Sequence, residues 1–139
     1  MGENREYNGM RRPLCKGKVL VVEDEPEMMA LVSFVLKRSG YDVVQAADGM
    51  EAIRQYDMEH PDLVVLDLNL PKVSGFRLLR LFKRASPVPT RVIVLTALDF
   101  QEAEEVARSG ADDFITKPFD PQQLLQKAEF ALNRLPVVG

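Results

Sequence analysis

Short apolar, β-branched runs alternate along the chain with amphipathic segments of helical period, from residue 18 onward. Each apolar run has the length and composition of a strand that is buried on both faces of a sheet. The predicted strands are Val19–Val22, Asp42–Ala46, Leu63–Leu66, Arg91–Leu95 and Asp113–Thr116. The alternation of strand and helix indicates right-handed crossovers and a parallel sheet that is covered by helices on both faces.

The segments between the strands carry signals for the beginning and the end of helices. Residues suited to begin the five helices are Pro26, Asp48, Ser74, Asp99 and Asp120. Residues expected to end a helix, or to follow its last turn, are Gly40, Pro61, Ala85 and Gly110. Helix residues expected to face the core are Met28, Leu31, Val32, Val35, Leu36, Ala52, Ile53, Tyr56, Phe76, Leu79, Phe82, Leu124, Leu125, Ala128 and Leu132.

The chain has 139 residues and 46% hydrophobic content, which suits one domain with one core. We place that domain at residues 17–135. Residues 1–16 lack apolar periodicity and are expected to form a flexible tail. Residues 136–139 are expected to be a C-terminal tail or the start of a linker.

Charge and cysteine content narrow the class of protein. A formal net charge of −3 disfavours a general nucleic-acid binder. No apolar stretch is long enough to span a membrane, and no signal-peptide pattern opens the chain. The single cysteine, Cys15, cannot form an internal disulfide, so the reducing cytoplasm is the expected location.

Carboxylates follow two of the predicted strands. Asp67 ends the third run, where open α/β sheets place their chemistry. Glu23, Asp24 and Glu25 follow the first run, and Glu25 is expected to cap the next helix. The adjacent carboxylates of Glu23 and Asp24 raise each other's pKa unless a cation lies between them. With Asp67 they form an acidic cluster that suits a hard ion such as Mg²⁺.

The ends of the fourth and fifth strands carry groups that can meet an anion. The Thr96 hydroxyl can donate to an anion or can bond its own backbone, and taken alone the second reading is favoured. Ala97 leaves its backbone N–H approachable. Lys117, usually a solvated charge in such a place, is expected to pair with Asp67. The following Pro118 holds Lys117 extended, and a cis bond is possible there.

Four motifs at these strand ends resemble the receiver domain of two-component response regulators. They are Val-Val-Glu-Asp-Glu at residues 21–25, Leu-Asp-Leu-Asn-Leu-Pro-Lys-Val-Ser-Gly at 66–75, Leu-Thr-Ala at 95–97 and Gly-Ala-Asp-Asp-Phe-Ile-Thr-Lys-Pro-Phe at 110–119. The resemblance covers about Lys18 to Leu135. It implies a flavodoxin-like (βα)5 fold, a doubly wound five-stranded parallel sheet of order 2-1-3-4-5.

The resemblance also implies a phosphoacceptor chemistry. Asp67 would accept a phosphoryl group from a histidine of a sensor histidine kinase or histidine phosphotransferase, or from a small phosphodonor. Mg²⁺ would be held by Asp24, Asp67, the backbone carbonyl of Asn69, and Glu23 directly or through water. The phosphoryl oxygens would contact Thr96, Lys117 and the N–H of Ala97. Such a protein catalyses only its own phosphorylation and dephosphorylation, so we do not expect an enzyme with a diffusible substrate.

A switch completes what the resemblance implies. Thr96 would move toward the phosphoryl group, and Phe114 would turn inward, for which plain core packing is the alternative role. The face of the fourth helix, fifth strand and fifth helix would then change and control an output domain or a partner protein. The resemblance allows a homodimer on phosphorylation, with no contact of this domain with nucleic acid or membrane.

The sequence departs from the family in three places. Leu70 stands where methionine is common, and the span from Thr96 to Gly110 is slightly short. Lys127, Glu129 and Glu105 do not follow the charge pattern through which the winged-helix branch of the family often dimerises. We therefore make no firm prediction of that dimer.

Two other classes of protein also use parts of this pattern. Phosphatases of the haloacid-dehalogenase type use a strand-end aspartate with a second aspartate two residues later, but Asn69 is at that position. A receiver-like interaction domain without phosphorylation would not need the set of Asp24, Asp67, Thr96 and Lys117. A glycine-rich nucleotide loop is absent from the sequence. His60 precedes a proline in a connection, so a phosphohistidine role is disfavoured.

Overall fold

The computed structural model describes residues 15–84, 90–97 and 100–133. Most of the predicted tail, the segment after residue 133, and the expected helix-boundary residues Ala85 and Asp99 lie outside these ranges. Cys15 and Lys16, which the sequence placed in the tail, lie against the sheet, and Lys16 N–H donates to the Gly40 carbonyl at 3.0 Å. Within the described ranges, no helix is both long and apolar enough to cross a membrane.

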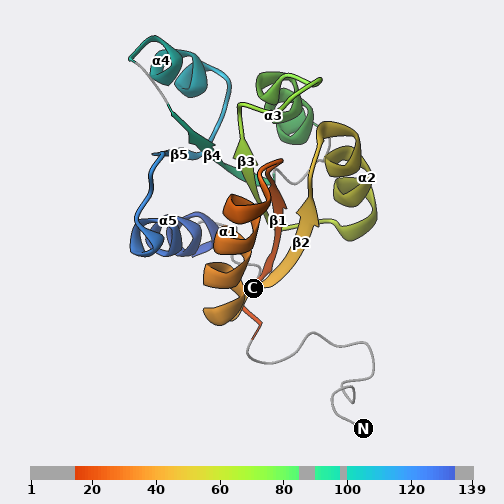
Figure 1. The fold of residues 1–139 in the computed structure, drawn as a ribbon, viewed down its shortest axis with the longest axis vertical. Coiled ribbons are helices and arrows are strands. Elements are labelled where there is room, and N and C mark those ends of the chain that lie inside the picture. The colour runs from red at the N-terminus through yellow and green to blue at the C-terminus, as the bar shows by residue number, and fades with distance from the viewer. Residues whose placement is uncertain (1–14, 85–89, 98–99, 134–139) are drawn as a thin grey trace, which may run out of the picture.

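Five parallel strands form one sheet in the order β2-β1-β3-β4-β5, as the resemblance predicted (Figure 1). The strands are β1 Lys18–Val22, β2 Asp42–Ala46, β3 Leu63–Asp67, β4 Arg91–Thr96 and β5 Asp113–Thr116. Each lies within one residue of its predicted bounds at either end. The order places β1 and β3 side by side at the centre, so the residues that end these two strands are neighbours.

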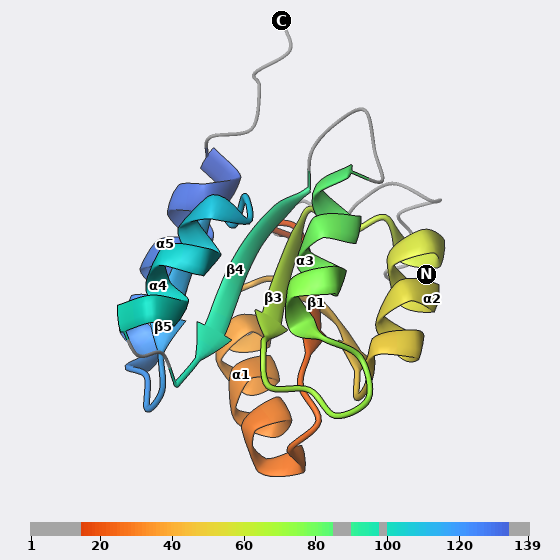
Figure 2. The ribbon, with the colours of Figure 1, turned by 90° about the horizontal axis from the view of Figure 1, so that it is seen from above.

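Two helical layers cover the sheet. The helices are α1 Pro26–Arg38, α2 Gly49–Glu59, α3 Gly75–Arg84, α4 Phe100–Arg108 and α5 Pro121–Asn133. Buried side chains of α1 and α5 share one core with one face of the sheet, and those of α2, α3 and α4 share a second core with the other face. In Figures 1 and 2, α1 lies across the strands from α2 and α3.

Alternate residues of the central strands belong to opposite cores. Val19 and Val21 of β1 face the core under α1 and α5, whereas Leu20 and Val22 face the core under α2, α3 and α4. All four side chains are fully buried. A strand that is buried on both faces needs a continuous apolar run, which is the pattern that the sequence shows.

The buried face of α1 differs from the predicted stripe. Leu31 is 43% exposed, whereas Met29 and Ser33 are buried beside Val32 and Leu36. Ser33 can be buried because its hydroxyl accepts a hydrogen bond from Gln45 Nε2 at 2.9 Å. A polar residue with a partner across the sheet edge therefore displaces an apolar one from the core, which helical periodicity alone did not indicate.

Two of the predicted helix caps are present in the structure. The Asp48 carboxylate accepts from Glu51 N–H at 2.8 Å and the Asp120 carboxylate from Gln122 N–H at 3.0 Å, so both aspartates cap their helices. In α3, Leu79 and Phe82 are buried as predicted, Phe76 is partly buried and packs against the core, and Leu78, which the prediction did not include, is buried as well. Exposed His60 follows α2 in a left-handed conformation with φ 49°.

A salt-bridge cluster around Asp112 lies at the amino ends of β4 and β5, opposite the carboxyl ends of the strands. Asp112 Oδ2 accepts from Lys83 Nζ at 2.8 Å and from Val92 N–H at 2.7 Å. Lys83 Nζ also donates to the Thr90 carbonyl at 2.9 Å. The cluster therefore connects the end of α3 with the start of β4 and with the residue that precedes β5.

Replacing Asp112 by asparagine should destabilise the fold by about 2–4 kcal/mol, because Lys83 and a backbone N–H would lose a charged acceptor. Urea unfolding followed by circular dichroism measures this change in free energy. The same substitution at Asp57, which is exposed on α2, is the control and should change the free energy of unfolding little. Equal stability of the two variants would contradict a structural role for the Asp112 cluster.

Candidate functional site

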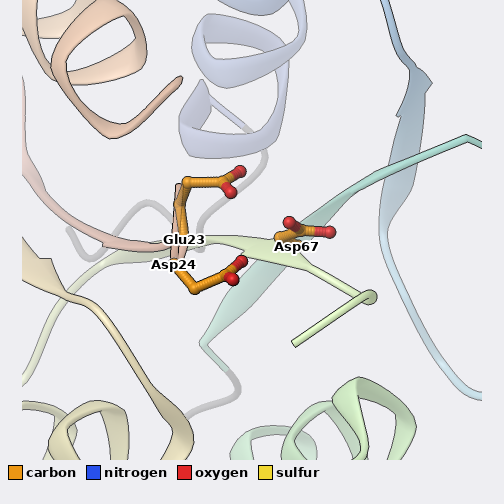
Figure 3. Close-up of side chains that lie close together, drawn as sticks. All are labelled: Glu23, Asp24 and Asp67. Carbon is orange, nitrogen blue, oxygen red and sulfur yellow. The ribbon is translucent and has the colours of Figure 1, made fainter. Parts of the chain in front are cut away.

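Three carboxylates meet at the carboxyl edge of the sheet (Figure 3). Glu23 and Asp24 follow β1, and Asp67 is the last residue of β3. One ligand oxygen from each residue lies within 4.8 Å of the other two. Glu23 is 1% exposed and Asp67 2% exposed, whereas Asp24 is open to solvent. The predicted acidic cluster is therefore present, and Asp24 is its solvent-facing member.

Lys117 reaches into this cluster from the end of β5. Its Nζ lies 3.0 Å from Asp67 Oδ2 and 3.4 Å from Glu23 Oε1, which confirms the predicted pairing with Asp67. The Lys117–Pro118 peptide bond is cis. Burial by itself lowers the pKa of Lys117, but the hydrogen bond and charge of Asp67 and the charge of Glu23 outweigh burial and raise it. The lysine is therefore held in its charged form.

For Glu23, in contrast to Lys117, the effect of burial on the pKa prevails. Burial, together with the neighbouring Asp67 carboxylate, raises the pKa of Glu23 from 4.5 to about 7, although the hydrogen bond from the Glu25 N–H and the charge of Lys117 act to lower it. That N–H donates to Glu23 Oε2 at 3.1 Å. Glu25 was expected to cap α1, but its side chain makes no capping hydrogen bond. At neutral pH the cluster thus contains a carboxyl group that resists ionisation.

Both oxygens of the Asp67 carboxylate are held by fixed donors. Oδ2 accepts from Lys117, and Oδ1 accepts from the Asn69 N–H at 2.9 Å. The Asn69 side chain itself is exposed. Sequence reasoning assigned Asn69 only a carbonyl role, and its N–H had no sequence signal because the bond depends on the shape of the loop after β3. The carboxylate is oriented before any ligand arrives.

Thr96 ends β4 beside this site. Its side chain is fully buried, and its Oγ1 makes no hydrogen bond to any residue of the described ranges. The alternative reading, in which the hydroxyl bonds its own backbone, is therefore not what the structure shows. A buried hydroxyl without a protein partner is uncommon, so this oxygen is available to a group that is brought to the site. Exposed Ala97 follows it directly.

A cleft of about 500 Å³ opens beside the acidic cluster, between α1, the end of β2 and the start of α2. Glu23 and Asp24 line it on one side, and Gln45 and Glu51 lie among its other lining residues. These last two residues belong to no motif, so the sequence did not indicate the cleft. It gives the exposed Asp24 carboxylate an open approach from solvent.

The proposed switch residue lies at the surface. Phe114 is 38% exposed on the edge strand β5, so core packing is not its role in this conformation. Of the α4 side chains that the structure describes, only Val106 is buried. The face formed by α4, β5 and α5 therefore includes a helix that is held by few core contacts.

A family model described as the response regulator receiver domain matches residues 19–129, which includes every group at this site. The chain belongs to that family. It is a receiver domain of a two-component response regulator, as the four motifs predicted.

Relatives of the receiver domain are transcriptional regulators. The chain is 40% identical over 124 residues to the alkaline phosphatase synthesis transcriptional regulatory protein PhoP of Bacillus subtilis, covering 88% of this chain and 51% of PhoP. It is 41% identical over 121 residues to the DNA-binding dual master transcriptional regulator RpaA of Synechocystis, covering 84% of this chain and 49% of RpaA. The receiver domain thus spans about half the length of these relatives.

Solved structures agree with the fold. The receiver domain of Francisella response regulator 1452 has a TM-score of 0.80 and 30% identity, over 86% of this chain and 99% of that one. The chemotaxis response regulator CheY4 of Vibrio cholerae has a TM-score of 0.76 and 30% identity, over 82% of this chain and 97% of that one.

The raised pKa of Glu23 makes stability depend on pH. Between the ordinary value of 4.5 and about 7 the folded state binds more protons than the unfolded state, so the free energy of unfolding falls as the pH rises. The loss amounts to at most about 3 kcal/mol, at about 1.4 kcal/mol per pKa unit. Replacing Glu23 by glutamine should remove this loss. The free energy of unfolding of the variant should therefore increase relative to that of the wild type as the pH rises from 4.5 to about 7.

Urea unfolding in Mg²⁺-free buffer from pH 4.5 to 8 measures this difference, with the exposed Glu104→Gln change on α4 as the control for the substitution itself. Wild-type and Glu23→Gln stabilities that run parallel across the whole range would contradict the role of Glu23.

Proposed function

We propose that Asp67 accepts a phosphoryl group from a phosphohistidine of a sensor histidine kinase or histidine phosphotransferase, or from a small phosphodonor such as acetyl phosphate. The observation that carries this proposal is the buried Asp67 carboxylate, held at 3.0 Å by Lys117 beside two further carboxylates. A structural ion pair would not need Asp24, which is exposed and has Asp67 as a close neighbour.

The transfer is a displacement at phosphorus. A carboxylate oxygen of Asp67 forms a P–O bond while the P–N bond to the donor imidazole, or the P–O bond to acetate, breaks and the leaving group keeps the electron pair. Catalysis of such a step is mainly positioning and neutralisation of charge. Lys117, already placed beside Asp67, can follow a phosphoryl oxygen. The Thr96 hydroxyl and the Ala97 N–H would donate to the others.

The donor set also fits a divalent cation. Glu23, Asp24 and Asp67 offer carboxylate oxygens within 4.8 Å of one another, and the backbone carbonyl of Asn69 would add a neutral oxygen. Hard oxygen ligands with a solvent-open side suit Mg²⁺, which keeps several waters. When bound, Mg²⁺ would supply the positive charge that offsets the negative charge of the donor phosphate and of the carboxylates.

Phosphorylation would be read out at the face of α4, β5 and α5. The Thr96 hydroxyl would gain its missing acceptor, and Phe114 would move from its exposed position toward the space that Thr96 vacates. The transcriptional-regulator relatives support an output domain that controls transcription. The homodimer that the resemblance allows would use the same face, where Lys127 Nζ binds Asp113 Oδ1 at 2.9 Å within the chain.

Replacing Asp67 by asparagine should abolish phosphorylation by acetyl phosphate in the presence of Mg²⁺, because the nucleophilic carboxylate is lost. Intact-protein mass spectrometry detects the added phosphoryl group. The Asp57→Asn variant, changed at an exposed site on α2, should be labelled like the wild type.

Labelling of the Asp67→Asn variant to the wild-type level would refute the proposed acceptor. An interaction domain without phosphorylation would show no labelling of the wild type. A haloacid-dehalogenase-type phosphatase would instead hydrolyse a phosphomonoester over many turnovers, so release of phosphate from such a substrate separates this alternative.

Adding Mg²⁺ should raise the melting temperature of the unphosphorylated protein, because the ion binds only the folded cluster and relieves repulsion between its carboxylates. At a free concentration ten times the dissociation constant the gain is about 1.4 kcal/mol. Differential scanning calorimetry measures the shift. Asp24→Asn should lose most of it, and NaCl of equal ionic strength should not reproduce it. An absent shift at millimolar Mg²⁺ would count against the metal site.

A further inference from the structure

We propose that Gly49, at the start of α2, is a positioning residue for the cation site, because it seats Val73 and so fixes the loop that carries Asn69. This inference rests on the proposed role of Asn69 in binding Mg²⁺. Gly49 itself touches neither the carboxylates nor a bound ion. It acts through the segment of residues 68–74, here called the β3–α3 loop, which leaves β3 directly after Asp67.

The two ends of the β3–α3 loop touch each other. A Cβ atom built on Gly75 would lie 2.5 Å from Leu68 Cα and 2.8 Å from the Leu68 carbonyl oxygen, so only glycine permits this approach. Leu68 N–H is anchored to the Leu95 carbonyl at 3.2 Å. The loop is therefore closed at its base, and its remaining freedom is at the tip.

The tip of the loop is strained. Lys72 has φ 74°, and Val73 N–H donates to the Pro71 carbonyl at 2.8 Å, which together form a γ-turn with positive φ. This turn is rare, and a side chain such as lysine raises its cost. Strained backbone of this kind persists only when surrounding contacts hold it. A contact at the tip is thus needed to keep the loop in this conformation.

Gly49 supplies that contact. A Cβ atom on Gly49 would lie 2.7 Å from Val73 Cβ, 2.9 Å from Cγ2 and 3.1 Å from Cγ1. Gly49 is the first residue of α2, behind the Asp48 cap, so its backbone conformation is one that any residue adopts. The glycine is required by the space that Val73 occupies and not by its own φ.

Asn69 lies in the loop between Leu68, which contacts Gly75, and Val73, which contacts Gly49. Its N–H binds Asp67 Oδ1 at 2.9 Å, and its carbonyl is the proposed cation ligand. A shift of Val73 away from α2 must be absorbed by the few residues between the tip and the base. The shape of the cation site therefore depends on a contact to a helix that supplies no ligand, as metal sites often depend on residues beyond the ligands.

The test combines two substitutions, Gly49→Ala, which adds a Cβ atom against Val73, and Val73→Gly, which removes the side chain that this atom would meet. Gly49→Ala should weaken Mg²⁺ binding by about tenfold, as loss of a supporting residue does at other metal sites. Val73→Gly removes the three atoms that lie nearest to the new Cβ, so adding Gly49→Ala to Val73→Gly should change Mg²⁺ affinity little. Isothermal titration calorimetry gives the affinities, and Met50→Ala, the exposed next residue of α2, is the control.

A second measurement reads the loop without any cation. The Asn69 amide resonance in the apo protein should move in Gly49→Ala and return toward its Val73→Gly position in the double variant. If Gly49 had a purely structural role, Gly49→Ala would lower the melting temperature but leave the Asn69 amide resonance and the Mg²⁺ affinity unchanged. Alanine favours a helix over glycine, so a lower melting temperature would report the clash with Val73. If the Gly49→Ala variant does not fold, the same two measurements are made on Val73→Gly, which also removes the contact between Val73 and Gly49.

Unchanged Mg²⁺ affinity and an unmoved Asn69 amide in a folded Gly49→Ala or Val73→Gly variant would overturn the positioning role. An equal effect of Gly49→Ala in the Val73→Gly background would overturn it as well, because the effect would not pass through Val73. A wild type that binds no Mg²⁺ would instead refute the metal site, and the amide resonance alone would then decide the role of Gly49.

Discussion

Two buried carboxylates lie on either side of one ammonium group at the carboxyl edge of the sheet, and the surrounding loops have the shape that this arrangement requires. Lys117 offsets part of the charge of Glu23 and Asp67, and the Glu25 and Asn69 N–H groups accommodate more of it. Burying carboxylates is unfavourable unless such partners are in place. The turn after β1 and the loop after β3 are thus built around the acidic groups.

The sheet and the membership of this site could be predicted because both depend on where apolar runs end. Parallel order brings the residues after β1, β3, β4 and β5 to one edge, and the pairing of Lys117 with Asp67 followed from that placement. Side-chain direction on a helix could not be predicted equally well. On α1, Ser33 is buried whereas Leu31 is exposed, and the Ser33 hydroxyl has partners in Gln45, on a neighbouring strand, and in Met29.

Contacts between distant segments account for the rest of what the sequence left open. The Asp112 cluster joins α3, β4 and the approach to β5 through residues that form no motif. The seat of Val73 on Gly49 likewise depends on how two loops meet in space. Ion pairs thus connect these segments at the amino ends of β4 and β5, whereas α4 buries only Val106 among its described side chains.

The unpartnered hydroxyl of Thr96 has a consequence for how sharply such a domain can respond. A buried polar group without a partner costs the folded state about 1–3 kcal/mol. In the proposed switch, the unphosphorylated conformation would carry that cost, and a conformation in which an acceptor reaches Thr96 would not. Since about 1.4 kcal/mol corresponds to a tenfold change in an equilibrium, this one side chain would shift the populations of the two conformations by about one to two orders of magnitude.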